Sequence, residues 1–285
     1  MKRLLPHIAL LTAALAAVGT LAPASADELT ERRELLLAEM RAVAEKTTVE
    51  FDSGAGRPQL VKNPVFRYDD QPRGFIDATM WAWTDAGLPV AFQKVEASID
   101  GVTGAPKWGY CFASVSENRL RVQWQDGKTF RSTEAGAAFR PHPEAPRVAD
   151  RSAARRLQVR ELSRDFSARI LLNPRTNSTE EMRLLARPIY EYDDPPGQYR
   201  GAAFGYSTGG RNPDLLILVE ARQADGVLRW HYAPVRLTIG GVTIKLDGKS
   251  VWEVPFIEPR PQDMPTWTFF YEPRNPLEGE GDAAP

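Results

Sequence analysis

Carboxylates recur in this chain at matching places where they could support acid–base or metal chemistry. Asp69-Asp70 and Asp193-Asp194 are adjacent dyads, and Glu96 and Glu220 each lie near the end of an apolar stretch. Glycoside hydrolysis needs two carboxyl groups about 5 to 10 Å apart, and Ca²⁺ needs several oxygen ligands. Because neighbouring residues of a strand point to opposite faces, each dyad is better explained as a turn.

Glu96 and Glu220 are the more informative carboxylates. A buried carboxylate is costly unless it is paired, so an apolar strand does not accept one without a reason. One explanation is a bond to a neighbouring backbone group or arginine, and the other is a role at a ligand site. Both residues are therefore candidate ligand-binding positions.

Trp81 and Trp83 share one face of an expected strand and form a second candidate ligand-binding position. Tryptophan faces can stack on sugar rings, although a small antiparallel core also needs large aromatic side chains. Core packing and a ligand face both remain open for this pair.

Other catalytic signals are weak. Residues 205–209 fit the G-x-S-x-G pattern around Ser207, but that motif needs a helix after the serine, and the next segment reads as a strand. Cys111 lies in an apolar run and is expected to be buried. Only His142 and His231 follow the first 26 residues, so we expect no catalytic residue, no metal site and no cofactor.

Residues 1–26 are typical of a signal peptide, with Lys2 and Arg3 before an apolar stretch and a small-x-small site at Ala24–Ala26. We therefore expect an exported chain, periplasmic or secreted, with no membrane span after cleavage. The whole sequence has 36 basic and 37 acidic residues, which gives no reason to expect a nucleic-acid partner.

The sequence also repeats itself. Residues 64–97 align without a gap on residues 188–221, so that Pro64 matches Pro188 at an offset of 124 residues. Eleven of the 34 aligned positions are identical, and both copies carry a Tyr-Asp-Asp-x-Pro segment and a Val-Glu-Ala segment. This similarity predicts a tandem duplication.

Each repeat begins with a helical pattern, over 27–46 and about 150–169, in which Leu29, Leu36, Met40 and Val43 share the face of the first helix. Short strand patterns with tight turns follow, including Asp126-Gly127-Lys128 and Asp247-Gly248-Lys249, and short connections indicate antiparallel pairing. The predicted fold is α+β: two tandem copies of a helix followed by a curved antiparallel sheet of five or six strands. The expected units are a signal peptide (1–26), repeat domain 1 (27–140), a linker (141–149), repeat domain 2 (150–256) and a Pro-rich, acidic, disordered tail (257–285).

The Tyr-Asp-Asp-x-Pro strand, the later Val-Glu-Ala strand and the Trp-x-Tyr pairs at Trp108 and Trp230 together resemble bacterial exported proteins of unknown function. The resemblance covers both repeats and implies no activity, cofactor or catalytic residue.

These observations favour a non-enzymatic binding or interaction protein of the cell envelope, whose partner is a glycan or a protein bound on the sheet faces or between the repeats. One alternative is a carbohydrate-active enzyme that uses Glu96 or Glu220. The other is an envelope scaffold that associates with itself through exposed sheet edges.

Overall fold

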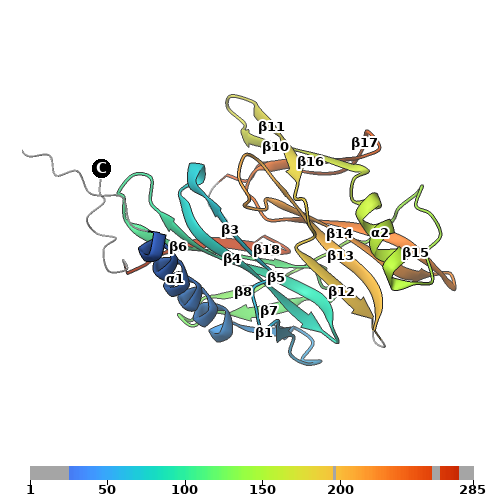
Figure 1. Cartoon of the computed structure of the whole chain (residues 1–285), viewed down its shortest axis with the longest axis horizontal. Helices are drawn as coiled ribbons and strands as arrows, with labels where there is room; N and C mark the ends of the chain where they lie inside the picture. Colours follow the sequence, from blue (N-terminus) through green and yellow to red (C-terminus); the bar gives the residue numbers. More distant parts are fainter. Residues whose placement is uncertain (1–25, 195–196, 259–263, 276–285) are drawn as a thin grey trace, which may run out of the picture.

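The computed structural model describes residues 26–194, 197–258 and 264–275. Within these residues the fold is mostly β, with two α-helices and three antiparallel sheets, one of them strongly curled (Figure 1). Antiparallel sheets accompanied by helices are thus confirmed, whereas the expected single sheet per repeat is not. The signal-peptide prediction concerns residues that lie, all but Ala26, outside the described part of the chain.

Helix α1 (Ala26–Lys46) opens the described chain and agrees with the helix expected over 27–46. Its buried face consists of Leu36, Met40 and Ala44, which are spaced one turn apart and pack in one cluster with the strands below. Leu29 was expected on that face but is 51 % exposed, because the apolar packing begins only at Leu36.

Strands β1 to β8 follow α1 in short steps. Their bounds are β1 Thr48–Phe51, β2 Gln59–Leu60, β3 Phe66–Asp70, β4 Phe75–Asp85, β5 Leu88–Ile99, β6 Pro106–Ser114, β7 Leu120–Gln123 and β8 Thr129–Arg131, with a 3₁₀ turn η1 at Gln71–Arg73. Strand β4 pairs with β2, β3 and β5, and β5 pairs with β6, while β1, β7 and β8 form a separate three-stranded sheet.

Helix α2 (Ser152–Leu162) is shorter than the helix expected over 150–169. Phe166 and the residues after it alternate between buried and exposed, and this period of two belongs to strand β10 (Phe166–Asn173). The remaining strands of this half are β11 Ser178–Leu184, β12 Tyr190–Asp194, β13 Gln198–Ser207, β14 Leu215–Ala224, β15 Val227–Arg236, β16 Gly241–Leu246 and β17 Lys249–Val254.

All the strands of this second half lie in one nine-stranded sheet. The sheet is continuous because β10 and β11 are long enough to pair with each other, and β11 also pairs with β13. In the first half, the two-residue strand β2 pairs only with β4, so β1, β7 and β8 separate from the main sheet. The predicted hairpins at Asp126–Lys128 and Asp247–Lys249 are confirmed.

Two segments at or beyond the expected ends of the repeats also join the sheets. Strand β9 (Arg140–Pro141), at the boundary between the expected repeat domain 1 and the linker, pairs with β15 of the second half. Strand β18 (Trp267–Pro273) pairs with β6 of the first half along its whole length, where it is the red strand among the blue-green ones in Figure 1. The prediction of a disordered tail is therefore wrong for residues 267–273, because their backbone pairs with β6 and Trp267 is buried in the core.

The buried residues form three clusters. One packs α1 on the inner face of the first sheet, another packs α2 in the second half, and the third joins side chains of both halves, including Phe92, Ala203 and Leu216. Among the described helices, none is long and apolar enough to cross a membrane.

Candidate functional site

A pocket of about 330 Å³ lies at the junction of the two halves, and we call it the junction pocket. Small-molecule sites occupy roughly 300 to 1,000 Å³, so the pocket is at the small end of that range. Its polar lining comes from both halves: Arg73, Lys94, Glu96, Asn212, Asp214 and Thr238. Its apolar lining consists of Phe75, Leu237 and Ile239, with Trp267, Phe269 and Tyr271 from β18.

Strand β5 brings two opposite charges into this pocket. Lys94 and Glu96 are two residues apart, so their side chains project from the same face of the strand. Both are almost fully buried, at 3 % and 1 % exposure. Lys94 Nζ lies 3.1 Å from Glu96 Oε1 and donates a hydrogen bond to the carbonyl of Pro213 at 3.3 Å. The ion pair thus offsets the cost of burying either charge alone.

Glu96 Oε1 also accepts hydrogen bonds from Tyr68 Oη at 2.6 Å and from Asn212 Nδ2 at 3.1 Å. Every polar contact of this carboxylate within the described chain therefore goes to one oxygen. Its Oε2 accepts no hydrogen bond from a described residue, so it is an acceptor that a ligand in the pocket could use.

Asn212 provides a second free acceptor. The residue is 2 % exposed, and its Oδ1 is buried without a hydrogen-bond partner. The amide orientation follows from its neighbour: a carboxylate only accepts, so the NH₂ group must face Glu96 and Oδ1 must point away from it. A buried acceptor left unsatisfied costs about 1–3 kcal/mol, which a donor on a bound molecule would recover.

Arg73 holds the two halves together beside the pocket. It contacts Asp70 Oδ2 at 2.5 Å in its own half and Asp214 Oδ1 at 2.7 Å in the other. It also donates to the carbonyl of Asn212 at 3.2 Å. Although burial alone lowers its pKa, Asp214 and Asp70 raise the pKa of Arg73 above the ordinary value, so the guanidinium stays charged.

The protonation states around Glu96 are fixed by burial. Desolvation raises the pKa of Tyr68 well above its usual value, and the charge of Glu96 adds to this effect, so the phenol remains a donor. Desolvation likewise raises the pKa of Tyr271 to about 12 and that of Cys111 to about 12. Cys111 is buried and free, as expected from the sequence, and is a poor nucleophile in this state.

The balance of charge in the pocket indicates the chemistry of its ligand. Arg73 and Lys94 are matched by Glu96 and Asp214, so the lining carries no net charge. The free acceptors suit O–H or N–H donors, and the aromatic side chains of β18 offer apolar surface to a ring. The arrangement therefore fits a small neutral molecule with neighbouring hydroxyl groups.

Glu220 occupies a different environment from Glu96. Its Oε2 accepts from Tyr192 Oη at 2.8 Å, and its Oε1 lies 2.9 Å from Arg222 and 3.7 Å from Arg200. Both oxygens are thus satisfied by the protein, and Glu220 does not line the junction pocket. Of the two predicted glutamates, only Glu96 faces this cavity.

Trp81 and Trp83 lie in the core beneath α1 and are 0 % and 5 % exposed. Trp81 Nε1 donates to Thr79 Oγ1, and Trp83 Nε1 donates to Gln93 Oε1. Their rings are covered by other core residues and cannot stack on a sugar. The aromatic surface of the junction pocket comes from β18 instead.

The remaining sequence candidates have structural partners. Asp70 does not cap a turn with its side chain but binds Arg73, while Asp69 pairs with Arg211 at 3.0 Å. Asp194 contacts Arg200 at 3.0 Å, and Asp193 lies 3.8 Å from Arg156. Ser207 donates to the carbonyl of Gly210 and is followed by strand β14, so it does not sit on a strand–turn–helix elbow.

Sequence reasoning missed Arg73, Lys94, Asn212 and Asp214. One signal was present for Lys94, because it is a charged residue inside the apolar stretch 90–97, and its aligned position in the second copy is Leu218. Asn212 and Asp214 lie in a segment that reads as an ordinary polar turn. Their importance depends on contacts across more than a hundred residues of chain.

The chain matches no protein-family model, no curated protein and no solved structure.

Proposed function

We propose that this chain is an exported, non-enzymatic binding protein of the cell envelope, and that the junction pocket holds its ligand. The observation that carries this proposal is the buried, unpartnered Oδ1 of Asn212 beside the buried Lys94–Glu96 pair. A protein keeps an unsatisfied buried acceptor at a cost, and ligand binding is a physical reason for keeping it.

The ligand class that fits best is a sugar ring or a related polyol, as part of an envelope glycan. Asn212 Oδ1 and Glu96 Oε2 can accept from neighbouring hydroxyl groups, and Lys94 has a proton free to donate in return. The apolar face of a sugar would rest on Trp267, Phe269 or Tyr271.

The enzyme alternative needs two carboxyl groups that flank the glycosidic bond of a bound substrate. Glu96 and Asp214 both line the pocket, but Asp214 is held by Arg73 and Thr208, and Glu220 lies elsewhere. No observation favours catalysis over binding. The scaffold alternative is supported only by the edge position of strands such as β18 and predicts a concentration-dependent increase in mass by light scattering.

We further propose that the two halves arose by tandem duplication of a helix–sheet unit. The pairing of β4 with β2, β3 and β5 is matched by that of β13 with β11, β12 and β14. The aligned pairs Tyr68–Glu96 and Tyr192–Glu220 make the same side-chain hydrogen bond. A crystal structure in which 64–97 and 188–221 do not superpose would refute the duplication.

Calorimetric titration of the chain without residues 1–26 against neutral sugars, polyols and cell-wall glycan fragments tests the binding function. The matched variants are Glu96→Gln and Glu220→Gln, because each alters one Tyr–Glu hydrogen bond but only Glu96 lines the pocket. We expect saturable binding that Glu96→Gln and Asn212→Leu weaken by about tenfold or more and Glu220→Gln leaves within about threefold.

Two outcomes would overturn the proposal. One is the absence of saturable binding across the whole panel, and the other is equal weakening by Glu96→Gln and Glu220→Gln. Release of a cleaved sugar during the titration, detected by mass spectrometry, would instead favour the enzyme. Export is tested separately by sequencing the N-terminus of the protein from the producing cells, which should begin at Asp27.

A further inference from the structure

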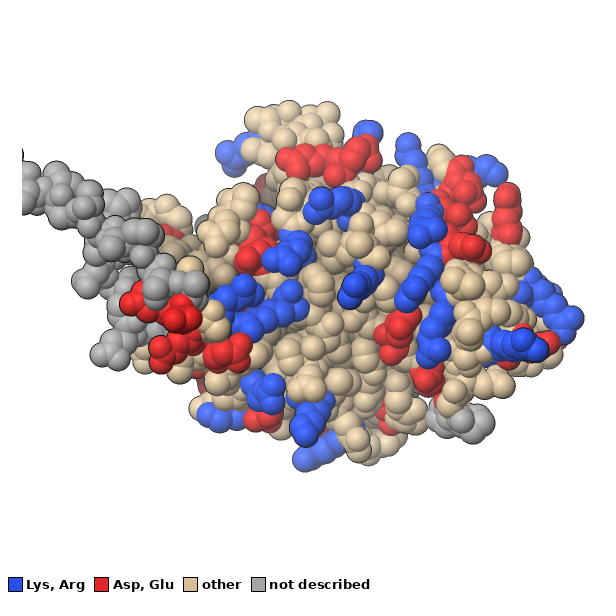
Figure 2. Space-filling model, in the orientation of Figure 1, with Lys and Arg blue, Asp and Glu red and all other residues tan. Residues whose placement is uncertain are grey.

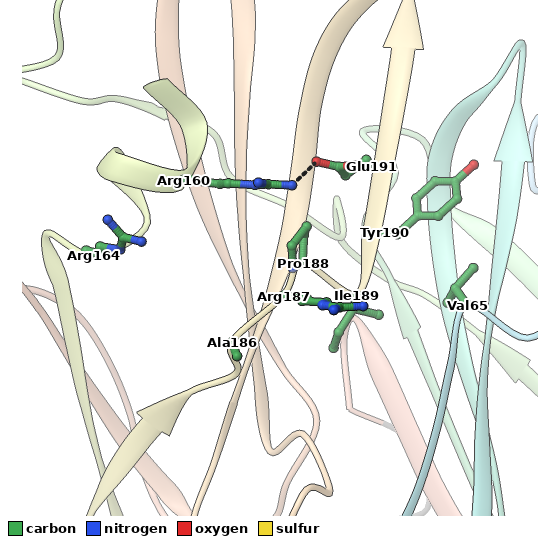
Figure 3. A pocket seen from close by; sticks show the side chains of 9 residues that line it. All are labelled: Val65, Arg160, Arg164, Ala186, Arg187, Pro188, Ile189, Tyr190 and Glu191. Carbon is green, nitrogen blue, oxygen red and sulfur yellow. Dashed lines mark ion pairs between the residues drawn. The ribbon is translucent and has the colours of Figure 1, made fainter. Parts of the chain in front are cut away.

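A second cavity lies apart from the junction pocket and shares no lining residue with it. It has a volume of about 590 Å³ and lies between the end of α2 and the segment that leads into β12. Figure 3 shows Arg160 on α2, Arg164 just past its end, and Arg187 beside Ile189. We call this cavity the arginine groove.

The charges that line the groove do not balance. Its three arginines face one carboxylate, that of Glu191, which lies 3.6 Å from Arg160 and also accepts a hydrogen bond from Tyr199 Oη. Neither Arg164 nor Arg187 has an ion-pair partner among the described residues. The chain as a whole is nearly neutral, so this local excess of positive charge is not a consequence of composition. Figure 2 shows a column of basic side chains near the place where Figure 1 draws α2, with acidic side chains next to it.

The backbone helps to position these arginines. Arg160 lies in the last turn of α2 and Arg164 in the turn just after its end at Leu162, and both side chains line the groove. Arg187 precedes Pro188, which restricts its backbone to extended conformations and limits where its side chain can go. The end of α2 contributes some negative potential, but Tyr206 Oη donates to the carbonyl of Ser163 there at 2.9 Å and reduces it.

The floor of the groove is apolar. Pro188 and Ile189 form it, Tyr190 stands at one side, and Val65 approaches from the first half of the chain. A guanidinium group matches the two oxygens of a phosphate or a carboxylate, and an apolar floor suits a ring or a short alkyl group attached to that anion.

We propose that the arginine groove is a binding site for an organic oxyanion, a phosphate ester or carboxylate carried on a ring or a short chain. Arg164 and Arg187 bind the anion, and Ile189 with Tyr190 contacts the organic part. This site is independent of the junction pocket, so failure of either proposal leaves the other intact.

Titration calorimetry with phenyl phosphate, inorganic phosphate and benzoate tests the proposal. We expect at least one of the two organic anions to bind saturably, and phenyl phosphate to bind about threefold or more tightly than inorganic phosphate, because only the ester reaches the apolar floor. Comparison of phenyl phosphate with benzoate shows which oxyanion the groove prefers. Affinity should fall as salt is raised, since the arginines are exposed.

Four variants separate a built site from general attraction to positive charge. Arg164→Gln and Arg187→Gln should each weaken binding by about tenfold, whereas Arg175→Gln, at the exposed turn after β10, should leave it unchanged. Glu191→Gln removes the competing carboxylate and frees Arg160, so it should tighten binding severalfold. Equal losses in Arg175→Gln and Arg187→Gln, no gain in Glu191→Gln, or no saturable binding of either organic anion would overturn the proposal.

Discussion

The clamp formed by Arg73 gives the sharpest test of how the two halves are held together. Arg73 contacts Asp70 and Asp214, each 3 % exposed, while its own side chain is 33 % exposed. Replacing it with Met leaves two buried carboxylates without their cation. Removal of one partner from a buried ion pair costs about 3–5 kcal/mol, and the partial exposure of Arg73 places the expected loss near the lower end.

Urea unfolding at pH 7 measures this loss. With a slope of about 3 kcal/mol per molar urea for a chain of this size, Arg73→Met should lower the midpoint by about 1 M. Adding Asp70→Asn and Asp214→Asn to Arg73→Met should recover most of the stability, because no buried charge is then left unpaired. High salt should not rescue the single variant, since screening is weak for buried groups.

Arg211 provides a matched control, because it also joins the two halves, through Asp69 at 3.0 Å. Its side chain is 57 % exposed, so Arg211→Met should change the free energy of unfolding by less than about 1 kcal/mol. If Arg73→Met cost no more than Arg211→Met, or the triple variant were no more stable than the single one, the Arg73 contacts would not stabilise the junction.

Three further predictions concern other buried groups. Burial lowers the pKa of His142 below its usual value despite the attraction of Asp165, so the free energy of unfolding should fall as the pH drops below about 6.5. In His142→Phe, the urea midpoint should change less between pH 7 and 5.5 than in the unmodified chain. A urea midpoint that rises as the pH falls would contradict this prediction. Arg236 donates to four carbonyls, and burial lowers its pKa to about 10. Arg236→Lys should lower the free energy of unfolding by about 2 kcal/mol, whereas Arg169→Lys, at an exposed ion pair, should leave it nearly unchanged. Equal losses in the two variants would contradict this prediction. The thiol of Cys111 should stay unmodified by an aromatic disulfide reagent until urea unfolds the chain, whereas rapid labelling in buffer would show that the site opens.

Local features were readable from the sequence because they depend on neighbouring residues. The bounds of α1 follow from a charged, amphipathic stretch, and the Asp-Gly-Lys turns close hairpins through backbone conformations that glycine adopts easily. The buried state of Cys111 also follows from the apolar run around it. The need of Glu96 for a compensating contact was also readable, since a carboxylate in an apolar strand requires one, and in the structure Glu96 lines the junction pocket.

Other features depended on where the chain brings distant segments together. From the sequence, Trp81 and Trp83 could face either solvent or the core. In the structure they lie in the core, because α1 packs over the face of the sheet that carries them. The segment 267–273 lies among prolines and reads as a tail, but the unpaired edge of β6 gives its backbone groups partners and makes it a strand.

The sequence alone determined the repeated motifs, the position of Glu96 and Glu220 within apolar strands and the chain's near-neutral charge. Only the tertiary structure decided that Glu96 opens on a cavity while Glu220 is enclosed by arginines and a tyrosine. The physical reason is that a carboxylate buried in either strand must find partners, but those partners come from distant segments: Asn212 lies 116 residues from Glu96, and Asp214 lies 141 residues from Arg73. Contacts over such separations are set by how the sheets pack and leave no pattern in the neighbouring residues.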